Sequence, residues 1–496
     1  MKATGKNYID GEWREAEGVF ESRNPADWDE VVGVFPQSGE REVAEAVTAA
    51  RRAFPEWKRW SRIKRGELFE RFVELTKART DDLAREIAWE CGKAINEARA
   101  DVTEGIHMAQ YVFGSTRMPH GNVISSEIRE KDAYMLRRPK GVMAVITPWN
   151  FPFAIPLWLL GPSLVEGNTA VFKPSEDTPL IGHRLAELFH EAGFPPGVLN
   201  VIHGDGEGAG APLVRHPAID AVLFTGSAQA GGEIRRVCAE HPHKMAVCEM
   251  GGKNALIVCE DAEFELALNA GILSSFKTTG QRCVSAGRIL IHESLLDKYA
   301  EHFVPMAQRV RVGDPLDEAT FMGPLINEAG LKKVEHYNAL AEEEGAEVLL
   351  KGGRLGGNGL SRGWFMSPFV CVMKPNGKSR VLREEVFGPH VALVPFRDME
   401  EAVRVYNDTE YGLACSVITE DFRKAREVLQ ECEFGLGYHN LPSIGAEVHL
   451  PFGGVKKSGT GMPSASALID AVTHRIAWTV NHGHEIRMAQ GLKAEI

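Results

Sequence analysis

The region 142–249 alternates short apolar runs with longer amphipathic stretches, and this alternation limits the fold more than any other feature of the sequence. The apolar runs have the length of buried strands, and the stretches between them have helical spacing. Such strand–helix–strand units favour right-handed crossovers within a doubly wound parallel sheet, so the predicted class is α/β. The predicted strands are 142–147, 170–172, 198–202, 221–224 and 244–248.

Polar residues follow most of these strands. Ligands of doubly wound sheets bind beyond the carboxyl ends of the strands, so these residues are candidates for a site. The set comprises Thr147, Pro148, Trp149, Asn150, Lys173, Glu176, Gly226, Ser227, Gly231 and Glu249. Turn and helix-cap preferences account for the Ser, Asn and Gly residues, but not for Lys173 and Glu249.

A glycine string at 204–210 superficially resembles the dinucleotide-binding fingerprint. A glycine string alone is a weak signal, and the fingerprint should open the first helix of a nucleotide-binding half, whereas this string follows the third predicted strand. We therefore expect a pyrophosphate at the turn 226–231, where the free N–H groups of a helix start would face it.

The rest of the chain predicts further elements around this sheet. Short strands with turns open the chain, and apolar runs after residue 254 indicate a second α/β unit. The predicted helical segments are 40–54 and a long stretch from 63 to 98 and beyond, and the later strands are 255–258, 288–292 and 391–395. Ile476, Trp478 and Val480 alternate with polar residues and predict a late strand, for which a second subunit could supply the partner.

Cys283 lies in the second unit, in a polar turn with Gly280, Gln281 and Arg282. A cysteine is a strong nucleophile only when its pKa is lowered or a base lies nearby, and such cysteines favour polar, glycine-flanked turns. A buried, unreactive cysteine is the commoner case for a lone cysteine. Both interpretations are open from this turn alone.

Composition excludes several classes of function. A chain of 496 residues suggests about three units, and a net charge of -12 argues against nucleic-acid or anionic-membrane partners. The eight cysteines form no Cys-x-x-Cys pair and share no zinc-ligand spacing with histidine, which predicts no metal site and a reducing, cytoplasmic compartment. The N-terminus lacks the apolar core of a signal peptide. The apolar stretch 142–165 contains four prolines, so we expect a buried strand, a turn and a short helix there.

Five motifs taken together favour the interpretation of Cys283 as a nucleophile over that of a buried, unreactive cysteine. They are Thr-Pro-Trp-Asn ending at Asn150, Lys-Pro-Ser-Glu from Lys173 to Glu176, Glu-Met-Gly-Gly-Lys from Glu249, Gly-Gln-Arg-Cys ending at Cys283, and Glu-Val-Phe-Gly-Pro from Glu385. In this order they resemble the NAD(P)-dependent aldehyde dehydrogenase superfamily, in its hydrolytic, non-acylating form, over nearly the whole chain. The resemblance implies a Rossmann-like cofactor-binding domain at 1–120 and 141–250, an α/β catalytic domain at 251–450, and a small β oligomerisation element at 121–140 and 472–485.

By this resemblance, Cys283 is the nucleophile that attacks the aldehyde carbonyl. The Asn150 side chain and the Cys283 N–H would form an oxyanion hole, and Glu249 would be the general base that hydrolyses the thioester to a carboxylic acid. Two alternatives stay open. One is acyl transfer to coenzyme A, whose enzymes usually lack a glutamate at the position of Glu249, and the other is a catalytically silent nucleotide-binding protein on the same fold.

The resemblance also implies residues that bind the cofactor. Lys173 and Glu176 would hold the adenosine ribose, and the Glu176 carboxylate would repel a 2′-phosphate, which favours NAD over NADP. The other expected cofactor residues are Thr147, Pro148, Trp149, Gly226, Ser227, Gly231, Glu385 and Phe387.

The expected substrate pocket follows from the tunnel of the family and comprises Trp158, Arg282, Val284, Ser443 and Gly445. A hydroxyl from Ser443 and an amide from Gly445 would suit a carboxylate, so a semialdehyde of an acid is one candidate substrate. Many members of the family have an Arg-Glu pair where this chain has Met462 and Pro463, and the consequence of that difference is open. The expected assembly is a homodimer or homotetramer.

Overall fold

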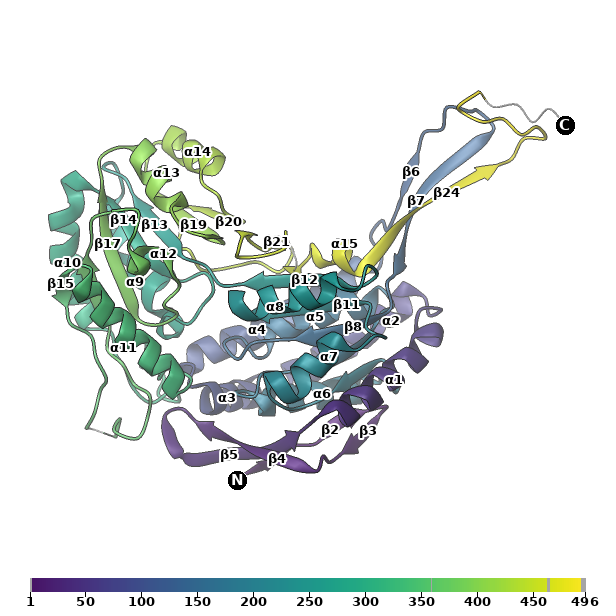
Figure 1. Ribbon diagram of the computed structural model, residues 1–496, viewed down its shortest axis with the longest axis horizontal. Coiled ribbons are helices and arrows are strands. Elements are labelled where there is room, and N and C mark those ends of the chain that lie inside the picture. Colours follow the sequence, from purple (N-terminus) through teal and green to yellow (C-terminus); the bar gives the residue numbers. More distant parts are fainter. Residues whose placement is uncertain (1, 358, 462–463, 492–496) are drawn as a thin grey trace.

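The computed structural model describes residues 2–357, 359–461 and 464–491. Figure 1 shows two α/β units side by side and a long β arm that extends away from the body. The predicted α/β class is confirmed, because each unit contains a seven-stranded sheet built mainly of parallel strands.

The first sheet has the order β12-β11-β8-β9-β10-β2-β3, and its strands β8 to β12 are parallel and lie where the sequence predicts them. Their bounds are β8 Val142–Ile146, β9 Thr169–Lys173, β10 Leu199–Val201, β11 Ala221–Gly226 and β12 Met245–Met250. The strand order reverses between β8 and β11. Ligands bind outside the carboxyl ends of the strands at such a reversal point.

Helices and an N-terminal β layer surround this sheet. The helices are α1 Glu40–Trp57, α5 Ala154–Val165, α6 Pro179–Ala192, α7 Ala211–Arg215 and α8 Ala228–Ala239. The hairpin of β2 Asn7–Ile9 and β3 Glu12–Arg14 extends the sheet in the antiparallel sense, and β1 Ala3–Thr4, β4 Gly18–Asn24 and β5 Asp27–Gln37 form a separate sheet.

The long helical stretch predicted from 63 to 98 and beyond is present, and it consists of three helices. These are α2 Arg62–Lys77, α3 Thr80–Cys91 and α4 Ile95–Ser115. Gly92 ends α3 with a left-handed φ of 73°, and a Cβ on this residue would lie 2.6 Å from the Pro324 ring. Glycine is therefore required where the chain turns from α3 into α4.

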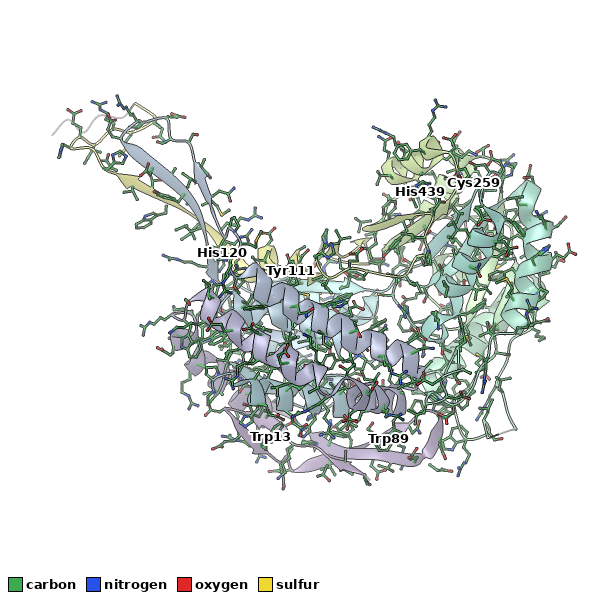
Figure 2. All side chains as sticks on the ribbon, turned by 180° about the vertical axis from the view of Figure 1, so that it is seen from behind. Trp13, Trp89, Tyr111, His120, Cys259 and His439 are labelled. Atoms are coloured by element: carbon green, nitrogen blue, oxygen red, sulfur yellow. The ribbon has the colours of Figure 1, made fainter. Side chains whose placement is uncertain are left out.

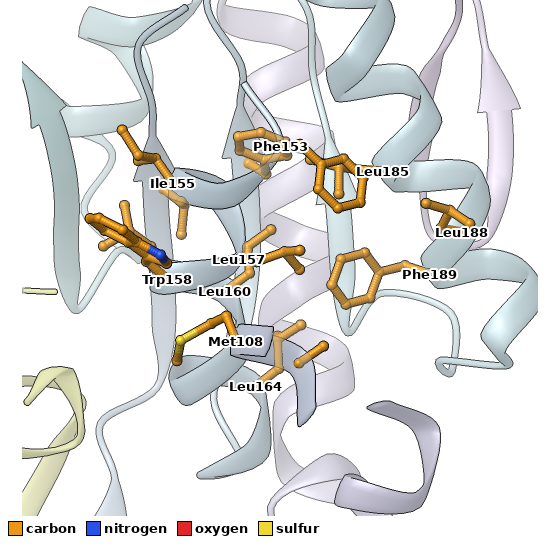
Figure 3. Close-up of a cluster of buried hydrophobic side chains, with 14 of the residues drawn as sticks. Met108, Phe153, Ile155, Leu157, Trp158, Leu160, Leu164, Leu185, Leu188 and Phe189 are labelled. Atoms are coloured by element: carbon orange, nitrogen blue, oxygen red, sulfur yellow. The ribbon is translucent and has the colours of Figure 1, made fainter. Parts of the chain in front are cut away.

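Every residue of α5 is buried, because this helix packs between the first sheet and α4. Figure 3 shows Phe153, Leu157 and Leu160 close to Leu185 and Phe189 of α6. Burying each such side chain contributes about 1.5–3 kcal/mol. The apolar stretch 142–165 is thus the predicted strand, turn and helix. No helix in the described part of the chain is long and apolar enough to cross a membrane.

The second sheet has the order β15-β16-β17-β14-β13-β19-β20, and only β15 is antiparallel. Its strands are β13 Asn254–Val258, β14 Ala286–His292, β15 Glu347–Leu350, β16 Phe369–Val372, β17 His390–Phe396, β19 Ala414–Ile418 and β20 Leu436–His439. Its helices are α9 Phe264–Phe276, α10 Leu296–Gln308, α11 Glu328–Glu343, α12 Arg380–Arg383, α13 Met399–Asn407 and α14 Phe422–Glu431. All three predicted later strands are present.

The β arm consists of β6 Asn122–Ile124, β7 Lys131–Pro139 and β24 Thr473–Asn481. The late strand expected from the sequence is β24, and it pairs with β7 of the same chain, with Trp478 opposite Tyr134. Seen from behind, His120 lies near the base of the arm (Figure 2).

The segment before β24 returns to the first unit. It contains short bridging strands and α15 Leu468–Val472, which packs against α5. The bridging pairs are β18 Tyr411–Gly412 with β22 Val455–Lys456, and β21 Pro451–Phe452 with β23 Ser464–Ala465. The Met250 N–H donates to the Ser458 carbonyl at 2.7 Å, so this segment covers the end of β12.

Candidate active site

A cavity of about 410 Å³ opens beyond the carboxyl ends of β8, β9 and β11, at the reversal point of the first sheet. Its walls include Thr147, Pro148, Trp149, Lys173, Glu176, Gly226 and Ser227. The Lys173 side chain is only 2% exposed, and its Nζ donates to the Pro174 carbonyl at 3.0 Å and to Glu176 at 3.1 Å. Lys173 thus holds the half-exposed Glu176 carboxylate at the wall of the cavity.

The start of α8 forms another wall. Ser227 caps this helix by accepting a hydrogen bond from the Ala230 N–H at 3.2 Å. The first N–H groups of a helix have no partners within the helix, and here they lie beside Ser227 at the cavity. The prediction for Gly231 is corrected, because Gly231 does not line the cavity. A Cβ there would lie 2.3 Å from the Met250 sulfur, so Gly231 lets α8 pack against the sheet.

The glycine string 204–210 also contacts this cavity, through Gly206 and Gly210. Asp205 caps its short helical turn by accepting from the Gly208 N–H at 2.6 Å. From the sequence we expected no part for this string in the site. That expectation was wrong, because the string forms a wall of the cavity even though it does not open the first helix of the unit.

A second cavity, of about 340 Å³, continues the first toward Cys283. The two share Pro148, Trp149, Thr225, Gly226 and Ser227 as wall residues. The second also includes Asn150, Cys283, Glu385 and Phe387. The rings of Trp149 and Phe387 meet edge to face, with centroids 5.7 Å apart. One continuous path therefore joins Glu176 to Cys283.

Glu385 enters this path through a close approach to two glycines. Its Oε1 accepts a hydrogen bond from the Gly252 N–H at 2.9 Å. A Cβ on Gly251 would lie 2.2 Å from the same carboxylate. Only glycine at 251 leaves room for Glu385, which gives a physical reason for the Gly-Gly pair after Glu249.

Cys283 differs from the other cysteines in exposure. It is partly exposed, whereas the other seven are buried. The Asn254 side chain fixes the backbone around Cys283, because its Nδ2 donates to the Cys283 carbonyl at 2.6 Å and to the Ser285 carbonyl at 3.0 Å. A thiol that faces a cavity from a fixed backbone can act as a nucleophile.

Asn150 follows β8, and Glu249 lies near the end of β12, on the other side of β11 in the first sheet. The Asn150 Nδ2 donates to the Gln281 carbonyl at 2.9 Å, and because an amide carries two N–H bonds, the second can point to a reacting oxygen. Glu249 is 1% exposed. Neither oxygen of its carboxylate has a hydrogen-bond partner among the described residues. The Gly459 backbone passes close to this carboxylate.

The pKa values of the thiol and the carboxyl shift in the same direction. Burial raises the pKa of Glu249 well above its ordinary value, and the Gly454 backbone offsets this only in part. Burial also raises the pKa of Cys283, and the nearby carboxylates Glu249 and Glu385 add to that effect. A thiol with a raised pKa needs a base to become a nucleophile, and a carboxylate with a raised pKa takes up a proton readily.

Comparison with known proteins decides the family. The sequence pattern of the "Aldehyde dehydrogenase family" matches residues 13–476. The chain belongs to the aldehyde dehydrogenase family. It is 34% identical to alpha-ketoglutaric semialdehyde dehydrogenase of Bacillus subtilis, covering 92% of this chain and 93% of that protein. It is 36% identical to alpha-ketoglutarate semialdehyde dehydrogenase of Haloferax volcanii, covering 93% of this chain and 95% of that protein.

Solved structures agree with this assignment. NAD-dependent aldehyde dehydrogenase from Sinorhizobium meliloti superposes with a TM-score of 0.94 at 33% identity, covering 99% of this chain and 97% of that chain. Betaine aldehyde dehydrogenase from Staphylococcus aureus in complex with NAD+ superposes with a TM-score of 0.93 at 31% identity, covering 98% of this chain and 97% of that chain. The resemblance and the fold class predicted from the sequence are confirmed, and the protein is an enzyme that oxidises an aldehyde to an acid.

The substrate wall of this aldehyde dehydrogenase differs from the expectation in part. Ser443 is fully buried, its hydroxyl donates to the Val284 carbonyl at 2.8 Å, and its N–H donates to the Ser274 hydroxyl at 2.9 Å. The expectation that its hydroxyl binds a substrate carboxylate is therefore wrong. Gly445 has a left-handed φ of 113°, and open space surrounds the position of a Cβ.

The other predicted wall residues are engaged with protein groups. Arg282 pairs with Glu97 at 2.7 Å and lies over the Phe151 ring at 5.0 Å, so its charge is already compensated. Trp158 is buried against the Phe452 ring, with centroids 4.7 Å apart, and Val284 is buried beside Cys283.

Some site residues were missed by sequence reasoning. Gln281, Asn254 and Lys333 shape the site around Cys283, and Lys333 lines the second cavity from α11. Asn254 directly follows the Gly-Gly-Lys motif, which was the available signal. Met462 and Pro463 lie outside the described residues. Within the described residues, no group of three or more His, Cys, Asp or Glu side chains could hold a metal ion.

Proposed function

We propose that this aldehyde dehydrogenase is NAD-dependent and hydrolytic, with Cys283 as nucleophile and Glu249 as general base. The observation that carries the proposal is the position of Cys283: it is the partly exposed thiol at the end of a path that begins at Glu176. Asn150 and Glu249 come to the same region from the first unit.

The reaction follows from these groups. Glu249 takes the thiol proton, and the Cys283 sulfur forms a bond to the aldehyde carbon while the carbonyl oxygen becomes negative. The Asn150 N–H and the Cys283 N–H stabilise that oxygen. Bound NAD would supply the acceptor for the hydride that leaves the same carbon, and the Cys283 sulfur would then hold the acyl group as a thioester. Glu249 first releases the thiol proton to solvent and then removes a proton from water, whose oxygen bonds to the acyl carbon. The bond between that carbon and the Cys283 sulfur breaks, the carboxylic acid leaves, and the proton on Glu249 returns to the sulfur.

The residues present fit a dinucleotide. Lys173 and Glu176 would bind the adenosine ribose, the start of α8 at Ser227 would bind the pyrophosphate, and Glu385 would bind the nicotinamide ribose. Phe387 and Trp149 would bound the nicotinamide ring. The Glu176 carboxylate supports NAD over NADP, because it would repel a 2′-phosphate.

Two features separate this proposal from acyl transfer to coenzyme A. Glu249 is present, and its enclosed carboxylate lies within electrostatic reach of Cys283. A hydrolytic enzyme produces the free acid with water alone, so product analysis in the absence of coenzyme A tests the choice. Turnover that requires added coenzyme A and yields an acyl-coenzyme A thioester would contradict the proposal.

The aldehyde itself is part of the proposal. Two relatives are named for alpha-ketoglutarate semialdehyde, so a semialdehyde of an acid is our first candidate. The test is a screen of NADH production over aliphatic, aromatic, carboxylate-bearing and cationic aldehydes. The highest kcat/KM should fall in the carboxylate-bearing group, and a preference for cationic aldehydes would contradict this choice.

The assembly and the domain division are proposals as well. We propose a homodimer or homotetramer built through the β arm, supported by exposed Trp478 and Val480 on β24. The arm would be the oligomerisation element (121–140 and 472–485) beside a cofactor-binding domain (1–120 and 141–250) and a catalytic domain (251–450). A cytoplasmic location is supported by eight free cysteines. Light scattering of the purified protein tests the assembly, and a monomeric mass would contradict it.

A further inference from the structure

Glu97, in the first turn of α4, places its carboxylate against the loop that carries Cys283. It accepts hydrogen bonds from the Thr278 N–H at 2.9 Å and from the Thr278 hydroxyl at 2.6 Å, and it pairs with Arg282 at 2.7 Å. The side chain is buried. Because α4 packs in the first unit and the loop belongs to the second, these bonds cross from one unit to the other.

The loop does not take its shape from local preference. Thr278 and Thr279 have left-handed φ values of 54° and 58°, and Gly280 follows at 69°. Left-handed backbone is unfavourable for residues with a Cβ, and more so for β-branched ones. Long-range bonds must therefore hold the loop, and besides Glu97 these include the Thr279 hydroxyl, which donates to the Gly323 carbonyl at 3.0 Å.

Asp101, one turn further along α4, makes the corresponding contacts with the segment after Asn150. Its carboxylate accepts from the Ala154 N–H at 2.8 Å and pairs with Lys93 at 2.9 Å. Residues four apart lie on the same face of a helix, so Glu97 and Asp101 project to the same side of α4. One helix face thus contacts both the loop of Cys283 and the segment of Asn150.

Phe151 connects the two ion pairs. Its ring is within reach of both cations, with the Lys93 Nζ 3.7 Å and the Arg282 guanidinium carbon 5.0 Å from the ring centroid. Cations attract the face of an aromatic ring. Phe151 directly follows Asn150, and Arg282 directly precedes Cys283. Each of the two proposed reacting residues is therefore adjacent in sequence to a residue of this group of contacts.

We propose that Glu97 is a positioning residue for catalysis, which fixes Cys283 relative to Asn150 through Thr278 and Arg282. The proposal rests on the proposed roles of Cys283 and Asn150. Burial opposes ionisation of Glu97, but Arg282 and Lys277 bring its pKa below the ordinary value, so the residue is a carboxylate at neutral pH.

The main test is Glu97→Gln, which preserves the shape of the side chain and removes its charge. We expect kcat to fall about 10- to 100-fold, since small misplacements of reacting groups cost about 10²-fold, with KM for NAD within about threefold. The rate at which iodoacetamide alkylates Cys283 should fall as well, measured by mass spectrometry of the Cys283 peptide without cofactor.

Glu90→Gln is the matched control. Glu90 is also a buried carboxyl group with three donors, namely the Ser22 hydroxyl at 3.0 Å, the Leu180 N–H at 2.8 Å and the Ile181 N–H at 3.2 Å. Burial raises the pKa of Glu90 to about 8, and its donors lie away from the loop that carries Cys283. We expect kcat and the alkylation rate of this variant to match the wild type.

A double-mutant cycle separates positioning from general support of the fold. If Glu97 aligns Asn150 with Cys283, Asn150→Ala should cost clearly less in kcat in the Glu97→Gln background than in the wild type. Fully additive losses would overturn the proposal, as would a Glu97→Gln enzyme with wild-type kcat and alkylation rate. Equal losses in Glu97→Gln and Glu90→Gln would overturn it too.

Thr278→Ala covers the case in which Glu97→Gln does not fold. It removes the 2.6 Å bond from the Thr278 hydroxyl to Glu97 and the 2.8 Å bond that this hydroxyl accepts from Arg282 Nε, and it leaves both partners of the Glu97–Arg282 ion pair in place. We expect slower alkylation of Cys283 and a smaller loss of kcat, and unchanged values of both would overturn the proposal. Failure of the proposed function has a different signature, because wild-type enzyme alkylated at Cys283 would then keep its activity.

Discussion

The two sides of the site are built in different ways. On the cofactor side the wall residues follow directly from regular elements, since Lys173 ends β9 and Ser227 follows β11 and caps α8. On the nucleophile side, Cys283 follows a left-handed turn and is held by side chains from distant segments, including Glu97 and Asn254. A parallel sheet brings its strand ends to one edge by its topology, whereas the nucleophile loop depends on long-range contacts.

This difference predicts unequal responses to substitution. A single change on the cofactor side removes one of several contacts with a long ligand, so losses there should be moderate. A change near Cys283 alters groups whose positions relative to the reacting carbon must be correct to a few tenths of an ångström. Losses of activity there should therefore be steep. The following substitutions test the contrast.

The largest effect is expected for Cys283→Ala, which should lower kcat by about 10⁴-fold or more because no other group replaces the sulfur. Cys371→Ala is the matched control, since Cys371 is a buried cysteine of β16 and should leave activity close to wild type. Steady-state NADH production measures both. A Cys283→Ala enzyme as active as the Cys371→Ala enzyme would refute the nucleophile.

Glu249→Gln should lower steady-state turnover by about 10²–10⁴-fold, as expected for loss of a general base. Thioester formation should continue more readily than its hydrolysis, so stopped-flow absorbance should show a burst of NADH followed by a slow phase. Unchanged steady-state turnover, without a burst, would argue against Glu249 as the base.

Asn150→Ala should lower kcat by about 10²–10³-fold, which is the usual cost of losing one oxyanion donor. KM for NAD should change little, because the side chain donates to the Gln281 carbonyl and, in the proposed mechanism, to the reacting oxygen rather than to the cofactor. Initial-rate kinetics with both substrates varied measures the two effects. A large rise in KM with constant kcat would place Asn150 in binding instead.

The smallest effect is expected for Glu176→Gln on the cofactor side. Removing the carboxylate should raise the ratio of kcat/KM for NADP to that for NAD by about tenfold, because roughly 1.4 kcal/mol of repulsion is lost. Glu233→Gln is the control, since Glu233 lines the same cavity from α8. An equal change in both variants would contradict a specific role for Glu176, and a wild-type enzyme that prefers NADP would contradict the electrostatic argument.

The same contrast explains what could be predicted from the sequence. The strands of the first sheet and the residues after them were predictable, because apolar runs alternate with helices and strand ends share an edge. Glu97 was not predictable, since it contacts Thr278 across 181 residues and lies in a helix whose pattern indicates only packing. The roles of Gly231 and Ser443 were wrong because sequence spacing does not reveal which face of an element meets the cavity.

The central claim is that a thioester forms on Cys283 and that Glu249 hydrolyses it. The most direct measurement is intact-protein and peptide mass spectrometry of the Glu249→Gln enzyme, quenched in acid after mixing with NAD and an accepted aldehyde. We expect an acyl group on the peptide that contains Cys283 and none on the wild-type enzyme after turnover. An unmodified Cys283 peptide, together with a stoichiometric burst of NADH, would contradict it.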